Sequence, residues 1–191
     1  MAYADYAFDG EADQDYAGSD VTGVGDMDGD GMADLVIGAP KNDEAATDAG
    51  RVYLLLGDGL STGTSSLADA DVIFEGEDTS NYAGVQVAGG DFDGDGLGDM
   101  LVSATGNDEA ANEAGKVYVI LGSGLTSSAL VGLETAPFSY LGENAVDNAG
   151  SEVVSAGDVD GDGREDILIG AHNNDNPGSN AGQAYLLFSD F

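Results

Sequence analysis

The apolar residues of this chain gather in short blocks that are separated by polar, glycine-rich segments. The longest blocks are Val52–Leu56 and Val117–Leu121, and a similar block spans Ala184–Phe188. Nearly continuous apolar runs of this length are typical of strands whose two faces are both covered. No segment has a convincing helical period, and the 31 glycines disfavour helix further. The pattern therefore predicts an all-β protein built from short strands.

These blocks recur along the chain in three similar units. Three related tetrapeptides begin at Phe8, Phe74 and Tyr140, so that the spacing is 66 residues in both steps. Each unit offers four strand candidates bounded by Gly, Asn and Asp turns. The first strands are Val21–Val24, Val85–Ala88 and Val153–Ala156; the second are Leu35–Ile37 and its two copies; the third are the apolar blocks above; and the fourth are Val72–Glu75, Ser139–Gly142 and, at the start of the chain, Tyr3–Phe8.

A repeating four-stranded antiparallel sheet with both faces covered is the blade of a β-propeller. The small residues of the first strand in each unit suit the crowded position nearest a propeller axis. A sandwich of unrelated hairpins is the alternative, and the regular period disfavours it. We expect one repeat domain over residues 1–191, with a closing strand in 1–10 and blades at about 11–76, 77–142 and 143–191.

A propeller ring typically has 4–8 blades, and this chain encodes three. We therefore expect a homodimer that closes as a six-blade ring, with Tyr3–Phe8 of one chain pairing with Ala184–Phe188 of the other. Two alternatives stay open. The chain is a fragment of a longer propeller, or it is an engineered or trimmed sequence that assembles without a ligand.

One acidic loop occurs three times, between the first and second strands of each unit. Aspartates occupy loop positions 1, 3, 5 and 9, and glycines at positions 4 and 6 allow a sharp turn. Together with a backbone carbonyl at position 7, these hard oxygen ligands predict three Ca²⁺ sites per chain, with magnesium as the weaker candidate. The predicted ligands are Asp26, Asp28, Asp30, Met32 and Asp34; Asp91, Asp93, Asp95, Leu97 and Asp99; and Asp158, Asp160, Asp162, Arg164 and Asp166.

The loop differs from an EF-hand, because position 12 is apolar (Ile37, Val102, Ile169) where an EF-hand has its closing Glu. The alternative explanation is that Asp-Gly pairs merely make good hairpin turns. Retention of all four aspartates in three copies favours metal binding.

The charge of the chain excludes some partners. Four basic residues face 37 acidic ones, which gives a formal net charge of −33. Nucleic acid and anionic membrane surfaces are therefore excluded as partners, since both require clustered Lys and Arg. No apolar run approaches the length of a membrane span, so we expect no membrane insertion. The acidity and the weak affinity typical of extracellular calcium modules predict an extracellular or cell-surface location.

The blocks around the acidic loop carry a family resemblance. Tyr82-Ala-Gly84, the loop itself, Gly38-Ala-Pro40 and Gly50-Arg-Val-Tyr53 resemble the FG-GAP repeat of integrin α-subunit propellers and their bacterial relatives. The resemblance departs at the Phe-Gly position, which is Ala-Gly throughout. The Gly-Ala-Pro block also becomes Ser103-Ala-Thr105 and Gly170-Ala-His172 in the later units. The resemblance implies a calcium-stabilised propeller whose loops bind protein or glycan partners.

The order of strands places two kinds of connection on the face opposite the metal loops: those between the second and third strands, and those that precede the first strands. Binding loops on a rigid scaffold commonly carry function, so this face is the candidate partner surface. A solvated acidic rim is the alternative. The candidate residues are Asp43, Glu44, Asp108, Glu109 and Asp175.

We expect no enzymatic activity and predict no catalytic residue. His172 is the single histidine, and it lies in a predicted turn without a nucleophile motif beside it. The alternative is a hydrolase or lyase with a carboxylate pair in a central channel. Asp20 and Glu152 are the acidic residues nearest the first strands, and they lie at the edges of those strands. The sequence thus predicts a calcium-binding module with a structural, adhesion or interaction role.

Overall fold

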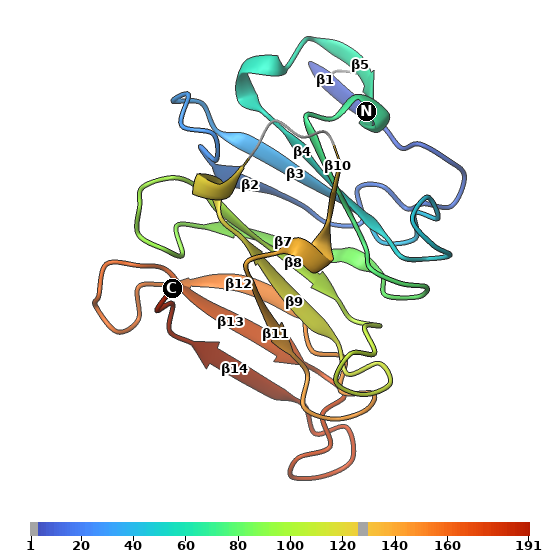
Figure 1. Ribbon diagram of the computed structural model, residues 1–191, viewed down its shortest axis with the longest axis vertical. Coiled ribbons are helices and arrows are strands. Elements are labelled where there is room, and N and C mark those ends of the chain that lie inside the picture. The colour runs from blue at the N-terminus through green and yellow to red at the C-terminus, as the bar shows by residue number, and fades with distance from the viewer. Residues whose placement is uncertain (1–3, 126–129) are drawn as a thin grey trace.

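The computed structural model describes residues 4–125 and 130–191, which form short β-strands joined by loops (Figure 1). The strands are β1 (Tyr6–Asp9), β2 (Val21–Gly25), β3 (Asp34–Ala39), β4 (Arg51–Leu55), β5 (Gly63–Ser66), β6 (Val72–Glu75), β7 (Ala83–Gly90), β8 (Asp99–Ala104), β9 (Lys116–Ile120), β10 (Leu130–Gly132), β11 (Phe138–Leu141), β12 (Glu152–Gly157), β13 (Asp166–Ala171) and β14 (Gln183–Leu187). The helices are the 3-10 turns η1 (Gly57–Gly59), η2 (Leu67–Asp69), η3 (Gly122–Gly124) and η4 (Leu133–Thr135). None of these three-residue turns is long and apolar enough to cross a membrane. The predicted all-β class is confirmed for this part of the chain.

The strands form one two-stranded sheet, β1-β5, and three larger sheets that follow one another along the long axis of the molecule (Figure 1). Their orders are β10-β6-β4-β3-β2, β11-β9-β8-β7 and β12-β13-β14. Within each sheet the first, second and third strands of a unit pair antiparallel, for example Leu35 with Leu55 and Leu101 with Val119. This is the predicted strand order of a blade. The described residues form no closed ring, so the six-blade homodimer stays a prediction.

Two strands were not predicted from the sequence. β5 and β10 lie in the connection between the third and fourth strands of their units, and each pairs parallel to the fourth strand of the preceding unit. β10 pairs with β6, and β5 pairs with β1. Each is short, and β5 is wholly polar, so neither carries the apolar signal of a strand. These strands bind consecutive units to each other along their outer edges.

The limits of some predicted strands shift. The fourth strand of the second unit is β11, which begins one residue earlier than expected, and β7 extends over eight residues. The amino-terminal strand is β1, while Tyr3 of the predicted strand lies outside the described residues. Such shifts are common because terminal residues of a strand carry little of its hydrophobic pattern.

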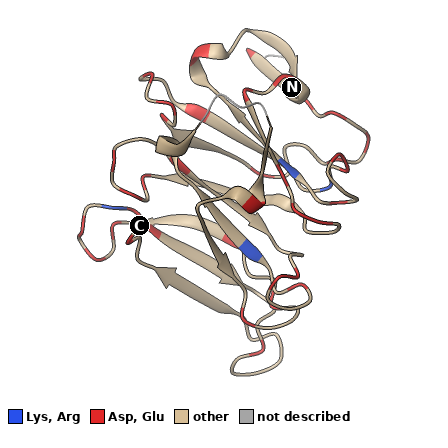
Figure 2. Ribbon diagram, in the orientation of Figure 1, with Lys and Arg blue, Asp and Glu red and all other residues tan. Residues whose placement is uncertain are grey.

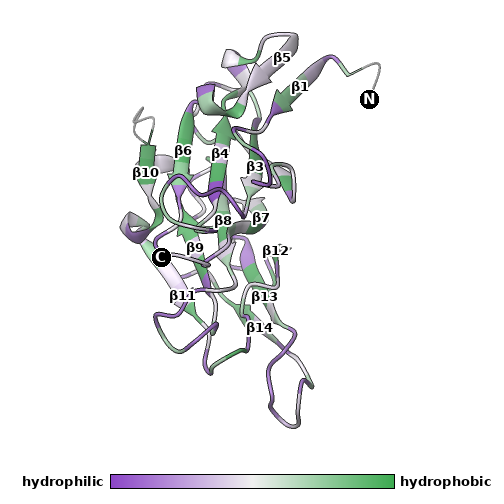
Figure 3. Ribbon diagram, turned by 90° about the vertical axis from the view of Figure 1, so that its right-hand side faces the viewer, coloured by the Kyte–Doolittle hydropathy of each residue, from purple (hydrophilic) through white to green (hydrophobic). Residues whose placement is uncertain are grey.

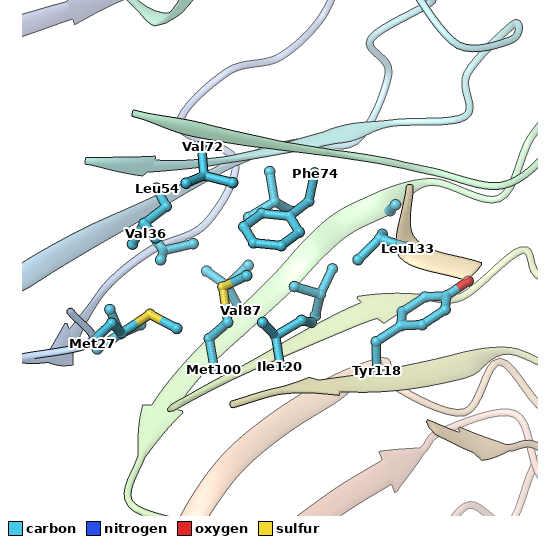
Figure 4. Packing of buried hydrophobic residues seen from close by; sticks show 14 of the residues in the cluster. Met27, Val36, Leu54, Val72, Phe74, Val87, Met100, Tyr118, Ile120 and Leu133 are labelled. Atoms are coloured by element: carbon cyan, nitrogen blue, oxygen red, sulfur yellow. The ribbon is translucent and has the colours of Figure 1, made fainter. Parts of the chain in front are cut away.

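The core lies between the sheets. Val36, Leu54 and Phe74 of the first sheet pack against Met100 and Ile120 of the second (Figure 4). On the other face of the second sheet, a separate cluster joins its alternate residues to the third sheet. Figure 3 shows the result, with hydrophobic strands and mostly hydrophilic connections. Every residue of β4 and β9 is buried, which confirms that both faces of these strands are covered.

The innermost strands of neighbouring sheets approach each other at their backbones. A Cβ placed on Gly89 of β7 would lie 2.6 Å from the Cα of Val24 and 2.7 Å from the carbonyl oxygen of Gly23, both in β2. The small residues predicted for positions near the axis are therefore required here by backbone contact between units.

Candidate metal centre

The three acidic loops connect β2 to β3, β7 to β8 and β12 to β13. In the first loop, Gly29 and Gly31 have φ values of +80° and +93°, a left-handed conformation that residues with a Cβ rarely adopt. The equivalent glycines of the other two loops are also left-handed. The sharp turn predicted from the sequence is thus formed in all three copies. Figure 2 shows that acidic residues lie mainly in connections of this kind.

The aspartate at position 1 fastens each loop. Asp26 accepts hydrogen bonds from the backbone amides of Gly29 at 2.8 Å and Gly31 at 2.8 Å. Asp91 and Asp158 accept the same pair of amides in their own loops. A carboxylate held by several amides keeps its remaining lone pairs in a fixed direction. Position 1 therefore has both a structural role and a defined geometry for a ligand.

The aspartate at position 9 is buried and joins two connections of its unit. Asp34 begins β3 and accepts a hydrogen bond from the Met27 amide at 2.7 Å and another from the Gly57 amide at 2.9 Å. Asp99 repeats this arrangement with the amides of Phe92 and Gly122. Asp166 does so with Val159 and Ser189. The sequence analysis missed this second role, although the recurring Gly57 and Gly122 after the third strands were its signal.

Carboxylate oxygens from positions 1, 3 and 9 lie within 4.8 Å of one another in every loop. These groups are Asp26, Asp28 and Asp34; Asp91, Asp93 and Asp99; and Asp158, Asp160 and Asp166. The structure thus brings together three of the four predicted carboxylates in each copy.

The predicted ligands at positions 5 and 7 are arranged differently. Asp30 gathers with Asp28 and with Asp58 of η1, which the sequence analysis did not consider. The position-5 aspartates accept hydrogen bonds from the amides of the position-7 residues: Met32 at 2.6 Å, Leu97 at 2.8 Å and Arg164 at 2.9 Å. The role of positions 5 and 7 as ligands stays a prediction.

The electrostatics of the loops favour a cation. Burial raises the pKa of Asp99 to about 6, against the lowering effect of amide donors from Gly122 and Phe92. The negative charge of Asp93 adds to the increase in pKa. Hard oxygen atoms at this density match the ligands that Ca²⁺ takes in proteins, and a divalent cation would offset their mutual repulsion. The chemistry of the three groups is therefore compatible with calcium.

The candidate partner face lies at the opposite ends of the strands. Asp43, Asp108 and Asp175 each accept a hydrogen bond from an amide five residues later, at 2.7, 2.6 and 2.7 Å. Glu109 accepts a hydrogen bond from Lys116 at 2.6 Å, while Glu44 is exposed. Several of the predicted partner residues thus hold their own loops in shape. Their role in binding a partner stays a prediction.

Two of the four basic residues are buried on this same side, which the sequence analysis did not foresee. Arg51 forms ion pairs with Glu11, at 2.9 Å, and with Glu75. Lys116 lies between Glu77, at 2.7 Å, and Glu109. Both basic residues open the third strand of their unit, and this shared position was the available signal. Arg51 pairs with Glu11 and Lys116 pairs with Glu77, and each glutamate lies in the segment that precedes the first strand of the same unit.

Comparison with known proteins places the repeat in a family. The family model for the FG-GAP repeat matches residues 17–55, 83–120 and 149–187, one match in each of the three larger sheets. The chain belongs to the FG-GAP repeat family, and its sheets are therefore propeller blades. The family predicted from the sequence motifs is confirmed.

Curated relatives fall into two groups. The chain is 34% identical to integrin alpha-5 of Xenopus laevis over 165 residues, which covers 83% of the chain and 14% of the relative. It is 32% identical to integrin alpha-V of Gallus gallus over 164 residues, with the same two coverages. It is 34% identical to the phosphatidylinositol-glycan-specific phospholipase D of Bos taurus over 154 residues, covering 76% of the chain and 17% of the relative. The chain thus spans about one sixth or less of the length of these relatives.

Proposed function

We propose that this chain is a calcium-binding, non-enzymatic propeller module that serves as a structural, adhesion or interaction unit outside the cell. The observation that carries the proposal is the position-9 aspartate, which occurs in the same place in all three blades. This aspartate begins the second strand and belongs to the group of three carboxylates in its loop. It also accepts a hydrogen bond from a backbone amide just after the third strand. A cation bound at each group would therefore connect three elements of its blade.

Calcium binding at these groups is expected to stabilise the fold. Ligands that bind the folded state and not the unfolded state raise the free energy of unfolding with their concentration. Carboxylates crowded together without a cation repel one another, so removal of calcium should be destabilising. At a calcium concentration 100 times the dissociation constant, one site contributes about 2.7 kcal/mol.

The test is thermal unfolding in calcium, in magnesium and after chelation. A triple variant with Asp28→Asn, Asp93→Asn and Asp160→Asn removes the position-3 carboxylate of each loop. A matched control with Asp5→Asn, Asp69→Asn and Glu134→Gln changes the net charge equally at exposed sites away from the loops. We expect calcium to raise the melting temperature of the wild type and the control, and not of the loop variant. An equal response of all three proteins would contradict the proposal.

An extracellular or cell-surface location is supported by two features. Extracellular calcium modules bind with dissociation constants of about 10⁻⁴–10⁻³ M, and loops that are largely exposed to solvent suit this range. The net charge of −33 favours a medium in which salt and divalent cations reduce self-repulsion. Calorimetric titration tests this part. A dissociation constant below about 10⁻⁶ M would instead fit a cytosolic calcium site.

A catalytic role for the whole protein is the second candidate, because one group of relatives is named as a phospholipase D. The same segment of this chain also matches integrin alpha chains, so the shared part is the repeat itself. We propose that the repeat supplies a scaffold and no reaction. Calcium-loaded chain incubated with a phosphatidylinositol-glycan-anchored protein is expected to release none of it, and release above a buffer control would favour the enzyme.

Binding of a protein or glycan partner is proposed for the face that carries Asp43, Glu44, Asp108, Glu109 and Asp175. A depression of about 520 Å³ on this face is lined by Glu77, Asn81 and Asn107 among others. Rigid loops with exposed carboxylates support the proposal. Exposed Glu44→Gln, compared with Asp69→Asn as a control on another connection, would weaken such binding if this face is used.

A further inference from the structure

The outer face of the third blade carries apolar residues that are buried in the other two blades. Leu54 of β4 and Val119 of β9 are fully buried against the following blade, whereas Leu186, at the same register position of β14, is 44% exposed. On the second strands, Leu168 is 37% exposed where Leu101 is fully buried. The third blade therefore has the surface of a blade interface without a blade packed on it in the described structure. We call this face, together with the outer edge of β14 and residues 179–182, the trailing end.

Consecutive blades are joined by backbone hydrogen bonds that recur with the repeat. Amides of the segment before each first strand donate to carbonyls just before the third strand of the preceding blade. The first junction has Gly76 to Gly50 at 2.9 Å, Ser80 to Thr47 at 2.8 Å, Tyr82 to Asp48 at 3.1 Å and Ala83 to Ala49 at 2.9 Å. The second has Gly142 to Gly115 at 2.8 Å, Val146 to Asn112 at 2.8 Å, Asn148 to Glu113 at 3.2 Å and Ala149 to Ala114 at 2.8 Å. The same four hydrogen bonds at each of the two junctions define a pattern that can be compared with the two ends of the chain.

The donor half of this junction is already shaped at the start of the chain. Gln14 and Tyr16 have φ values of +71° and +55°, and their counterparts Ser80 and Tyr82 have +61° and +57°. Non-glycine residues rarely adopt this conformation, so its recurrence marks a segment built for the same contacts. Within the described residues, the amides of 10, 14, 16 and 17 donate to no such carbonyl row. We call this segment, with β1 and the outer face of the first blade, the leading end.

The acceptor half is shaped at the other end of the chain. Asn180 has a φ of +50°, which matches +52° at Asp48 and +51° at Glu113. Gly182 is left-handed, as are Gly50 and Gly115 at the same position. The carbonyls of residues 179–182 are therefore presented as in the two formed junctions. One chain carries both halves of a third junction, at opposite ends.

The strand edges are complementary as well. β1 pairs with β5 in the same parallel way as β6 pairs with β10, so β1 takes the place of a fourth strand. β6 also pairs antiparallel with β4, with Arg51 opposite Glu75. β1 has no partner of that kind in the described residues, and neither has the outer edge of β14. Transferring the β4–β6 register places Gln183 opposite Asp9 and Leu186 opposite Tyr6.

The residue that opens β14 suits this register. The side-chain oxygen Oε1 of Gln183 is buried and has no hydrogen-bond partner within the described residues. At the same position in the first two blades, Arg51 and Lys116 hold carboxylates from neighbouring segments. Gln183 opposite Asp9 would repeat, with a neutral donor, the contact that Arg51 makes with Glu75.

We propose that the leading end of one copy of this chain binds the trailing end of a second copy, and that two such junctions close a six-blade homodimer. The occupant is a second copy because both halves of the junction are on this one chain. Two identical junctions related by a two-fold axis leave neither end uncovered. The inference rests on strand edges and backbone geometry, and it does not depend on the proposed calcium sites.

Solution mass in calcium tests the proposal, with variants of exposed residues that leave the fold of one chain intact. Leu186→Asp puts a charge on the trailing end, and Leu130→Asp puts the same charge on a residue of β10 that is 52% exposed, against 44% for Leu186, and that lies outside either end. We expect two chains of 19.2 kDa for the wild type and Leu130→Asp, and one chain for Leu186→Asp. A one-chain mass for the wild type at high concentration would overturn the proposal and leave these ends to a further blade or another protein.

A cross-link tests the register itself. The chain has no cysteine, so Tyr6→Cys combined with Leu186→Cys introduces one pair of exposed thiols that the junction brings together. Mild oxidation is expected to give a covalent dimer from the double variant and only monomer from either single variant. A ladder of larger species would show an open chain of copies and overturn the closed pair. A dimer that forms although calcium does not stabilise the protein would contradict the proposed calcium-binding function and leave the proposed junction standing.

Discussion

The first two blades and the third blade contain nearly the same sequence pattern in different surroundings. β4 and β9 are buried at every residue, whereas burial alternates along β14 between half-buried and exposed positions. The basic residue that opens β4 and β9 is replaced by Gln183 in β14. The comparison teaches that the apolar pattern of a third strand is set by the repeat and is nearly the same in all three blades. The exposure of its side chains depends instead on whether another blade packs on it. Variants at matched positions can separate the two.

The largest difference is expected at the residue that opens the third strand. Arg51→Ala leaves Glu11 and Glu75 as partly buried carboxylates without their cation, which typically costs about 3–5 kcal/mol. Gln183→Ala removes no ion pair and should change the free energy of unfolding by less than about 0.5 kcal/mol. Urea unfolding of the two variants at low protein concentration measures both effects. Similar losses would show that the first and third blades are held in the same way.

The next effect concerns the apolar residue three positions further along the strand. Leu54→Ala opens a cavity in the packed interface of Figure 4 and should destabilise by about 3 kcal/mol. Leu186→Ala truncates a half-exposed side chain and should cost well under about 1 kcal/mol in a single chain. If instead Leu186→Ala costs as much as Leu54→Ala, and the cost grows with protein concentration, the trailing end is covered in solution. That result would sharpen the comparison in favour of the homodimer.

A smaller effect is expected from the acidity of Asp99 in calcium-free protein. Burial raises its pKa from 3.8 to about 6 in the folded chain, so its protonated form is the one that folding favours. The contribution of Asp99 to the free energy of unfolding is therefore fully present below about pH 4 and is lost as the pH rises through about 6. Relative to Asp99→Asn, the calcium-free wild type should therefore lose on the order of 1–2 kcal/mol between these pH values. A difference that does not vary with pH would contradict the raised pKa.

Hydrogen exchange should show the smallest and most local contrast. Amides of β9 lie between two paired strands, and those on the outer edge of β14 lack a partner strand in the described structure. We expect slow exchange in β9 and exchange faster by orders of magnitude on the β14 edge at low protein concentration. Protection of β14 that appears only at high concentration would support the proposed junction. Protection at every concentration would show that another element covers this edge.

The sequence predicted the features that depend on local pattern. The blade order follows from apolar blocks such as Val52–Leu56, and the loop turns follow from glycines, which accept the left-handed conformation without strain. The acidic groups were found because the aspartates repeat at fixed spacing. Three of their four members meet in each loop, and the family match supports their interpretation.

Contacts between units could not be predicted in the same way. β5 and β10 are short and carry little apolar signal, since backbone pairing with the preceding blade defines them. The ion pairs of Arg51 with Glu11 and of Lys116 with Glu77 join residues about 40 positions apart, which no local pattern reveals. The link from Asp34 to Gly57 also depends on two connections meeting at one end of the blade. Each of these contacts is a property of the stacked repeat and not of a single segment.

Calcium stoichiometry tests the central claim most directly. Native mass spectrometry of the wild type and of the variant that carries Asp28→Asn, Asp93→Asn and Asp160→Asn counts bound ions per chain. The account predicts three calcium ions for the wild type and fewer in the variant, because each loop gathers its own acidic group. Absence of bound calcium from the wild type, or the same number in both proteins, would contradict it.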